Sequence, residues 1–322
     1  MTTASSQAIQ QAATFPVFAP HSDYARSIAG LSSGVLWTTL AILLLVIGLV
    51  SYAVHKFRAK PGAATPKPVY GNVKLEIAYT VGFIVILGII SVFSIRAMQA
   101  SDPPTSGTNS LLIVAHQWWW EVRYPATGIV TANEIHVPVG QPVEIDVTSA
   151  DVIHTFWVPE LQVKIEAIPG LTNKTWIKAD SAGTFRGQCA QYCGKQHAHM
   201  AFIVVAQPKA AYEQWLATES KPPAPPTTAL AKKGAQLFPD SPCALCHTIE
   251  GTKAQGTFGP NLTHVGSRQY LAAGTLKNTP ANMAQWISFP QKIKPGSTMP
   301  SMHQFPTDPF VKAVVAYLQS LK

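Results

Sequence analysis

Two short cysteine motifs contain the residues of this sequence with the clearest chemistry. Residues 189–200 have the spacing C-x3-C-x3-H-x2-M, and residues 243–247 have the spacing C-x-x-C-H. Thiolate and thioether groups select copper, and imidazole suits it as well, whereas C-x-x-C-H is the attachment motif of a c-type haem. The sequence contains four cysteines, and all of them lie in these motifs. A copper site and a haem site on one chain predict one-electron transfer.

The first motif supplies four candidate copper ligands: Cys189, Cys193, His197 and Met200. Two thiolates can bridge a pair of copper ions, each capped by an imidazole, with a weakly bound thioether that tunes the potential. A second imidazole is therefore needed, and His154, in the upstream segment 150–159, is the candidate. His199 competes with His197 for the other position. The alternative interpretations are a disulfide or structural cysteines for the motif, and a hydrogen-bonded core histidine for His154.

The second motif predicts a covalently bound haem. Cys243 and Cys246 would bond to the haem vinyl groups, and His247 would be the proximal iron ligand. Met299, followed by a proline, is the expected sixth ligand, which would raise the reduction potential. Other residues of the same segment are also candidates: Met302 and Met283 for the iron, and Arg268 or Trp286 for a haem propionate.

Two apolar runs near the N-terminus are each long enough to cross a membrane. Residues 31–54 and 77–95 are 24 and 19 residues long and contain no charged side chain, against the roughly 20 residues that a spanning helix needs. Only 12% of the chain is charged, and its mean hydropathy is +0.13. We therefore expect a transmembrane helical hairpin at 31–100, with spans at about 31–55 and 76–97.

The charges around these runs predict the orientation of the hairpin. Residues 55–74 contain five Lys or Arg residues and no acid, so the positive-inside rule places this loop in the cytoplasm. The segment 1–30 and everything after residue 100 are then extracytoplasmic. The N-terminal residues lack a basic stretch followed by an apolar core, so the first span is expected to be an uncleaved anchor.

The rest of the chain divides into a β-rich segment, a linker and a helical segment. Across 101–208, short β-branched or aromatic runs alternate with turn signals, which predicts an antiparallel β-sandwich. The strand-like runs are Leu111–Val114, Val143–Val147, Thr175–Lys178 and Phe202–Val205. A linker is expected at 209–228, ending in the proline-rich run 221–228. Residues 229–322 show helical patterning, with a last helix at about 309–321.

The β-rich segment, with its copper motif, resembles the cupredoxin domain of subunit II of the haem–copper cytochrome c oxidases. The segments that match are 115–121, 150–154, 166–170 and the copper motif itself. Together with the hairpin, the resemblance runs from about residue 31 to residue 207. It implies a dinuclear copper A centre with these ligands: His154 and Met200 on one copper, His197 and the backbone carbonyl of Gln191 on the other, and Cys189 and Cys193 as bridges.

The resemblance also implies roles for three further positions. Trp118 matches the surface tryptophan through which electrons reach the copper pair. Gln191 replaces a glutamate that, in most members, helps to bind magnesium at the contact with subunit I; an amide is a poorer magnesium ligand, which weakens the case for that ion here. Glu76 matches a carboxylate at the mouth of a proton path into subunit I. The alternative interpretation of Glu76 is a favourable interaction with the helix dipole.

Residues 229–322 resemble the small, all-α class I cytochrome c domain that is fused to subunit II in many bacterial oxidases, most closely at 259–268. The two resemblances imply subunit II of a proton-pumping terminal oxidase in the bacterial inner membrane. Electrons would pass from haem c through the copper pair to subunit I, where oxygen is reduced to water; this chain contains no catalytic residue for that reaction. Expected partners are subunits I and III, membrane lipid, and a quinol-oxidising complex or small electron carrier as donor.

Two other functions fit the same motifs. The chain would also suit the electron-accepting subunit of a copper-containing nitric oxide reductase, or a membrane-tethered electron carrier. Residues 229–322 contain nine basic and three acidic residues, a formal net charge of +6, which would steer an acidic donor towards the haem. Nucleic acid is not an expected partner, because the basic residues are scattered and no binding motif accompanies them.

Overall fold

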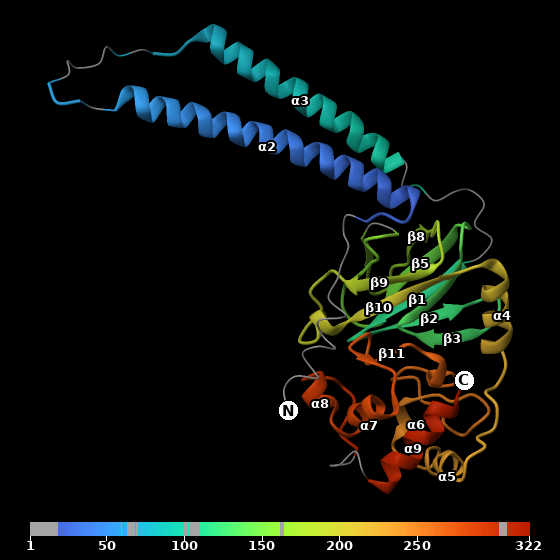
Figure 1. The fold of residues 1–322 in the computed structure, drawn as a ribbon. Coiled ribbons are helices and arrows are strands. Elements are labelled where there is room, and N and C mark those ends of the chain that lie inside the picture. The colour runs from blue at the N-terminus through green and yellow to red at the C-terminus, as the bar shows by residue number, and fades with distance from the viewer. Residues whose placement is uncertain are drawn as a thin grey trace. The chain divides into compact units, whose positions relative to one another are not determined.

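The structure is a computed structural model that describes residues 19–58, 60–62, 68, 70–99, 102, 110–161, 164–302 and 308–322. It divides into two units, an apolar helical pair at 26–102 and a second unit that contains the β-rich and C-terminal segments (Figure 1). Expectations that fall on 1–18, 103–109 or 303–307, including the start of the outer domain just after residue 100, lie outside the described residues.

The two apolar runs form the long helices α2, Asp23–Phe57, and α3, Val73–Gln99. Both are long and apolar enough to cross a membrane. The start of α3 is capped from two sides: the Asn72 side chain accepts a hydrogen bond from the Leu75 amide, and the Glu76 carboxylate accepts one from the Asn72 amide, each at 3.2 Å. This reciprocal arrangement satisfies two of the amides that a helix start leaves unpaired. Glu76 therefore has a structural role at this helix end.

The β-rich segment is a sandwich of two five-stranded sheets. The first contains, in spatial order, β3 (Ile129–Ala132), β2 (Trp119–Tyr124), β1 (Ser110–His116), β5 (Val143–Ser149) and β8 (Asn173–Ile177). The second contains β4 (Glu134–Pro138), β10 (Ala201–Gln207), β9 (Gly183–Cys189), β6 (His154–Trp157) and β7 (Ile165–Ala167). Each of the four predicted runs lies in or overlaps a strand.

Most neighbouring strands are antiparallel, as predicted, but two pairs are parallel: β1 with β5, and β4 with β10. Parallel neighbours cannot be joined by a tight hairpin and need a long crossover. Here the chain leaves the first sheet after β3, forms β4 in the second sheet, and returns to place β5 beside β1. The periodicity of a strand reports its buried face, not the direction of its neighbour, so the sequence did not reveal these pairs.

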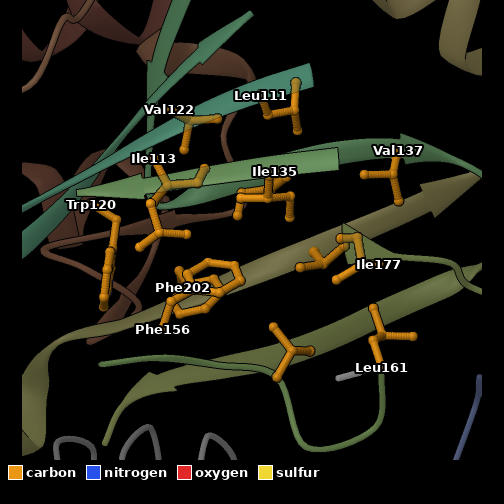
Figure 2. Packing of buried hydrophobic residues seen from close by; sticks show 14 of the residues in the cluster. Leu111, Ile113, Trp120, Val122, Ile135, Val137, Phe156, Leu161, Ile177 and Phe202 are labelled. Carbon is orange, nitrogen blue, oxygen red and sulfur yellow. The ribbon is translucent and has the colours of Figure 1, made fainter. Parts of the chain in front are cut away.

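The core lies between the two sheets, and its aromatic centre holds the strands that carry the copper motif (Figure 2). Phe156 and Phe202 stack with ring centroids 4.5 Å apart, and Trp120 meets both rings edge-on. All three side chains are fully buried, and burial of such a side chain contributes about 1.5–3 kcal/mol. Phe156 follows His154 by two residues and Phe202 follows Met200 by two, so the core fixes the strands that present these ligands.

The linker predicted at 209–228 is shorter than expected, because its first half is a helix. Helix α4, Lys209–Glu219, packs on the sandwich through Trp215, which stacks on His136 at a centroid distance of 4.1 Å. Tyr212, Trp215 and Leu216 have the i, i+3, i+4 spacing of a helix face. The extended part is therefore confined to residues 220–228, and its ends make contacts: Lys221 accepts a hydrogen bond from His264, and Thr228 caps the next helix.

The C-terminal segment is a small helical domain. Its helices are α5 (Ala229–Leu237), α6 (Cys243–Cys246), α7 (Pro280–Ser288), α8 (Pro290–Ile293) and α9 (Pro309–Ser320), with a short hairpin of β11 (Tyr270–Leu271) and β12 (Leu276–Lys277). The predicted last helix is confirmed as α9, which buries Val314, Tyr317 and Leu318 in the domain core. The predicted fold class is confirmed: two apolar helices, a β-sandwich and a small helical domain.

Candidate metal centres

The predicted copper ligands meet at one end of the sandwich. The Sγ atoms of Cys189 and Cys193 are 3.8 Å apart, far longer than the roughly 2.05 Å of a disulfide bond. The Sγ atom of Cys189 lies 3.8 Å from His154 Nδ1 and 3.3 Å from the Gln191 carbonyl oxygen. The Sγ atom of Cys193 lies 3.6 Å from His197 Nδ1 and 3.8 Å from Met200 Sδ. This is a set of soft and imidazole donors that suits copper.

Strand ends and one loop bring these residues together. His154 begins β6 and Cys189 ends β9, and these two strands are neighbours in the second sheet. The loop from Cys189 to Met200 then closes over the strand end, because the Cys189 amide donates a hydrogen bond to the Met200 carbonyl at 3.0 Å. His199 turns away from the thiols and bonds through Nδ1 to the Gln196 side chain at 2.7 Å. The geometry therefore favours His197 over His199.

Asp151 is a functional candidate that the sequence did not single out. Its carboxylate lies 2.8 Å from Nε2 of His154 and also accepts hydrogen bonds from the Gln117 and Val152 amides. Because a carboxylate must accept here, Nε2 of His154 holds the proton and Nδ1 faces the thiols with a free lone pair. A carboxylate–histidine–metal arrangement of this kind orients the ligand. An acid three residues before a candidate ligand is the sequence signal that could have identified it.

The thiols strongly affect each other's ionisation. The Cys193 thiol donates a hydrogen bond that lowers the pKa of Cys189 to about 4, against the opposing effect of burial, with help from His154. The same shared proton, together with burial, raises the pKa of Cys193 above its ordinary value. Burial alone would lower the pKa of His154, but its hydrogen bonds to Asp151 and Cys189 raise it. One thiolate is thus formed readily, as a metal ligand must be.

Trp118 lies between the thiol cluster and the C-terminal domain. Its indole Nε1 donates a hydrogen bond to the Cys193 carbonyl at 3.0 Å, and Gln117 Nε2 donates to the same oxygen at 2.8 Å. Its neighbours in the tryptophan run differ: Trp119 stacks on His116 at a centroid distance of 4.3 Å, and Trp120 is in the core. Gly194 leaves room for the indole, since a Cβ there would lie 3.0 Å from its ring.

The same tryptophan lines a large cavity in the C-terminal domain. The cavity has an empty volume of about 1260 Å³, including the part that is open to solvent. The predicted haem residues line it: Cys243, Cys246, His247, Met299, Met302, Met283, Arg268 and Trp286. Trp118 and Trp119 contribute to its wall from the sandwich side. One cavity thus holds the attachment motif, the candidate iron ligands and the residue nearest the copper motif.

The side chains of the cavity fit a haem. His247 Nδ1 lies 2.8 Å from the Pro260 carbonyl, and since a carbonyl only accepts, Nδ1 carries the proton and Nε2 is free to bind iron. Arg268 is half-buried and donates to the Asn261 carbonyl at 2.5 Å, and its buried Nε atom has no partner among the described residues. A buried donor without a partner is expected to meet a polar group, and a haem propionate would supply it.

Three methionines line the cavity, and they are not equivalent. Met283 is buried, and its Sδ atom accepts a hydrogen bond from Gln319 at 3.7 Å, which gives it a structural role. Met299 and Met302 are both half-buried and both lie against the domain core. The sequence preference for Met299 therefore stays a prediction.

Gly259→Ala is expected to displace the His247 ring. A Cβ at this position would lie 2.6 Å from Cε1 and 2.9 Å from Nδ1 of His247. Overpacking of this kind costs about 1–3 kcal/mol, so the thermal midpoint should fall and the low-spin haem spectrum should weaken. The haem should stay attached in denaturing electrophoresis, because both cysteines remain. An unaltered spectrum and midpoint would show that Gly259 does not hold the imidazole in place.

Comparisons with known proteins follow the same three-part division of the chain. Residues 8–97 match the family described as cytochrome C oxidase subunit II, transmembrane domain, and residues 126–207 match its periplasmic domain. Residues 231–322 match the cytochrome c family. A protein with this fold and these two sites is a membrane-anchored electron-transfer protein with a copper domain and a haem c domain.

Individual relatives agree with these matches. Cytochrome c oxidase subunit 2 of Alkalihalophilus pseudofirmus is 37% identical over 293 residues, which cover 87% of this chain and 84% of the relative. The Bacillus subtilis protein of the same name is 32% identical over 311 residues, 88% of this chain and 87% of the relative. A crystal structure of the periplasmic domain of subunit II of cytochrome oxidase from Bradyrhizobium japonicum has 34% sequence identity to this chain. The match covers 35% of this chain and 94% of the crystallised chain, with a TM-score of 0.35. The chain belongs to the cytochrome c oxidase subunit II family.

Proposed function

We propose that this chain is the electron-accepting subunit of a haem–copper oxidase that reduces oxygen to water and pumps protons. In this proposal the chain would accept electrons from an external donor through a covalent haem c and would pass them through a dinuclear copper A centre to subunit I. The haem and the copper pair supply the one-electron redox chemistry. The chain itself supplies their ligands and holds the two sites close together.

The observation that carries the proposal is the position of Trp118. Its side chain lines the haem cavity and donates a hydrogen bond to the carbonyl of Cys193, a candidate copper bridge. A single side chain thus contacts both sites, and an aromatic ring in that place shortens the gap that an electron must cross. This geometry supports Trp118 as the residue through which electrons reach the copper pair.

The copper ligands in this proposal are those implied by the family: His154 and Met200 on one copper, His197 and the Gln191 carbonyl on the other, and both cysteines as bridges. The thiol cluster supports this set through the distances given above. His154, Cys189 and Cys193 alone already bring three ligand atoms within 4.8 Å of one another. For the haem, the proposed ligands are His247 and Met299, with thioether bonds to Cys243 and Cys246.

The metal domains are placed on the outer side of the bacterial inner membrane in this proposal, together with both termini. The basic loop between the helices supports this orientation. The start of α2 also supports it: Ser22 Oγ, just before the helix, donates to the Leu161 carbonyl at 2.7 Å, and Tyr24, in its first turn, stacks on Trp176. The beginning of the first apolar helix therefore lies against the sandwich.

Membership of the family implies subunit I as a partner. Subunit III, membrane lipid and an external donor, either a quinol-oxidising complex or a small electron carrier, are the further partners that we propose. The direct test is purification of the chain in detergent with its large subunit, followed by oxygen consumption with a reduced cytochrome or an artificial donor. Recovery of a large subunit that reduces nitric oxide and not oxygen would contradict the proposal and favour the reductase alternative.

Trp118→Phe is expected to slow electron transfer from haem to copper by at least severalfold. Phenylalanine keeps an aromatic ring but loses the Nε1–H donor to Cys193 and part of the ring that bridges the two sites. Flash-induced reduction of the haem, followed optically at both metals, measures this step. The spectra of both sites should be unchanged. A normal rate in this variant would reject the assigned role of Trp118 and leave the oxidase function standing.

A further inference from the structure

Lys294 is a buried lysine at the contact between the haem domain and the sandwich. Only 4% of its surface is exposed, although lysine is almost never buried without a partner. Its Nζ atom donates hydrogen bonds to the Trp118 carbonyl at 3.0 Å and to the Ala272 carbonyl at 3.3 Å. Burial lowers the pKa of Lys294 to about 7, with a smaller opposing effect from Cys193. Burying a lysine side chain is unfavourable, so its position here indicates a specific structural role at the contact.

Further hydrogen bonds join the same two surfaces. Among the described residues, Gln196 Nε2 donates to the Pro295 carbonyl at 2.6 Å and the Ala201 amide to the Ala273 carbonyl at 3.1 Å. The Gln269 amide donates to the Glu134 carboxylate at 2.9 Å, and Ser267 Oγ donates to the Glu219 carboxylate at 3.1 Å. Three of them use backbone groups, which requires a defined register between the domains. The contact is therefore a shaped interface and not a loose tether.

The charges at this interface are complementary. The sandwich side contributes the carboxylates of Glu219 and Glu134, which attract the half-buried Arg268 guanidinium. The haem domain contributes the Nζ atom of Lys294, which donates to the Trp118 carbonyl. Complementary charges at an interface fix its register more than they raise its affinity. The haem domain is thus held in one orientation, with its cavity against Trp118.

We propose that Lys294 is a positioning residue for electron transfer, which docks the haem domain on the backbone of Trp118. The indole of Trp118 is held by Cys193 on the copper side, and its carbonyl is held by Lys294 on the haem side. The chain therefore contains a docking site for its own haem domain, and an external donor meets the haem domain instead of Trp118. The docking itself is inferred from the hydrogen bonds alone. Its role in electron transfer rests on the proposed function.

Lys294→Met tests the docking in the full chain, purified with its complex. Methionine keeps the length of the stem and loses the donors. Hydrogen exchange at the Ala201 and Gln269 amides reports the interface directly, and protection should fall roughly fivefold or more, because the bond from Lys294 to the Trp118 carbonyl is lost and a hydrogen bond contributes about 1 kcal/mol. Transfer from haem to copper should slow, whereas reduction of the haem by the donor and both metal spectra should be unchanged.

Lys292→Met is the matched control. It removes the same charge two residues away, from an exposed side chain whose Nζ lies over the Phe289 ring at 4.4 Å, so exchange and transfer should stay normal. Should Lys294→Met fail to accumulate, Lys294→Gln, which is too short to reach Trp118, is expected to show the same losses.

Three results would overturn the inference: normal protection in the Lys294 variants, rapid exchange at both amides in the unmodified protein, or equal losses in Lys292→Met. The inference and the proposed function fail separately. Lost protection at normal transfer rates would retain the docking and remove its role in electron transfer. A complex that does not reduce oxygen would remove the proposed function and leave the exchange result intact.

Discussion

Cys189→Ser is expected to abolish the proposed dinuclear copper centre. The Cys189 Sγ atom lies close to Cys193, His154 and the Gln191 carbonyl at once, so it is central to the cluster. A serine hydroxyl is a harder and more weakly acidic ligand than a thiol, and soft ligands are what bind copper tightly in such sites. Copper content per chain should fall, and the mixed-valence paramagnetic signal with hyperfine splitting from two equivalent copper nuclei should disappear. Oxygen consumption with a haem-reducing donor should be lost with it.

His199→Gln is the matched control for this experiment. It changes an imidazole in the same loop that bonds to Gln196 and not to the thiols, so copper content and the paramagnetic signal should be retained, whereas His197→Gln should lose both. A single-copper signal in the unmodified protein would contradict the dinuclear assignment. Loss of copper in the His199 variant but not in the His197 variant would show that the loop presents the other imidazole.

The motifs predicted much of the candidate site because the donors are close in sequence. Cys189, Cys193, His197 and Met200 lie in one loop, so their spacing alone indicates a common centre. His154 could be predicted only as the missing imidazole, and its position beside Cys189 follows from the pairing of β6 with β9. Asp151 and Lys294 act through contacts that a single sequence does not display: one is hydrogen-bonded to a ligand, and the other lies 176 residues from its partner Trp118.

The three consecutive tryptophans show where residue type alone is insufficient. A run of three tryptophans is typical of a packed strand, and the resemblance to the family singled out Trp118 as the exposed one. The structure separates them by register: β2 begins at Trp119, Trp120 points into the core, and Trp118 precedes the strand and bonds to Cys193. Alternation along a strand assigns opposite faces to neighbours, but the starting residue depends on the pairing with β1. That pairing is a tertiary property.

The interface between the sandwich and the haem domain could not be predicted from the sequence either. The proline-rich run predicted a tether, and an extended segment remains at 220–228. The tether explains how the haem domain stays near the sandwich, but not the orientation in which it docks. That orientation depends on backbone groups such as the amides of Ala201 and Gln269. Every residue has such groups, so no sequence pattern marks them.

Met299→Ala is expected to leave the haem attached and to open its sixth coordination position. In the proposed site Cys243 and Cys246 would hold the haem covalently, and His247 keeps its orienting bond to the Pro260 carbonyl, so neither attachment nor the proposed proximal ligand should change. Loss of the thioether removes the ligand that favours the reduced iron, and the reduction potential should fall. Carbon monoxide should then bind to the reduced protein and shift its absorption spectrum. The rate of electron transfer from the haem to the copper site should change as well, because the lower haem potential alters the driving force of this step.

Met302→Ala and Met283→Ala complete this experiment, because all three methionines line the cavity. Met302→Ala should keep the potential and resist carbon monoxide, since it removes apolar contact but no ligand. Met283→Ala should lower stability by about 2–5 kcal/mol, the usual cost of a buried methionine-to-alanine change, because Met283 is 2% exposed and bonded to Gln319. Its haem should still resist carbon monoxide. If Met302→Ala opens the iron to carbon monoxide and Met299→Ala does not, the thioether ligand is Met302.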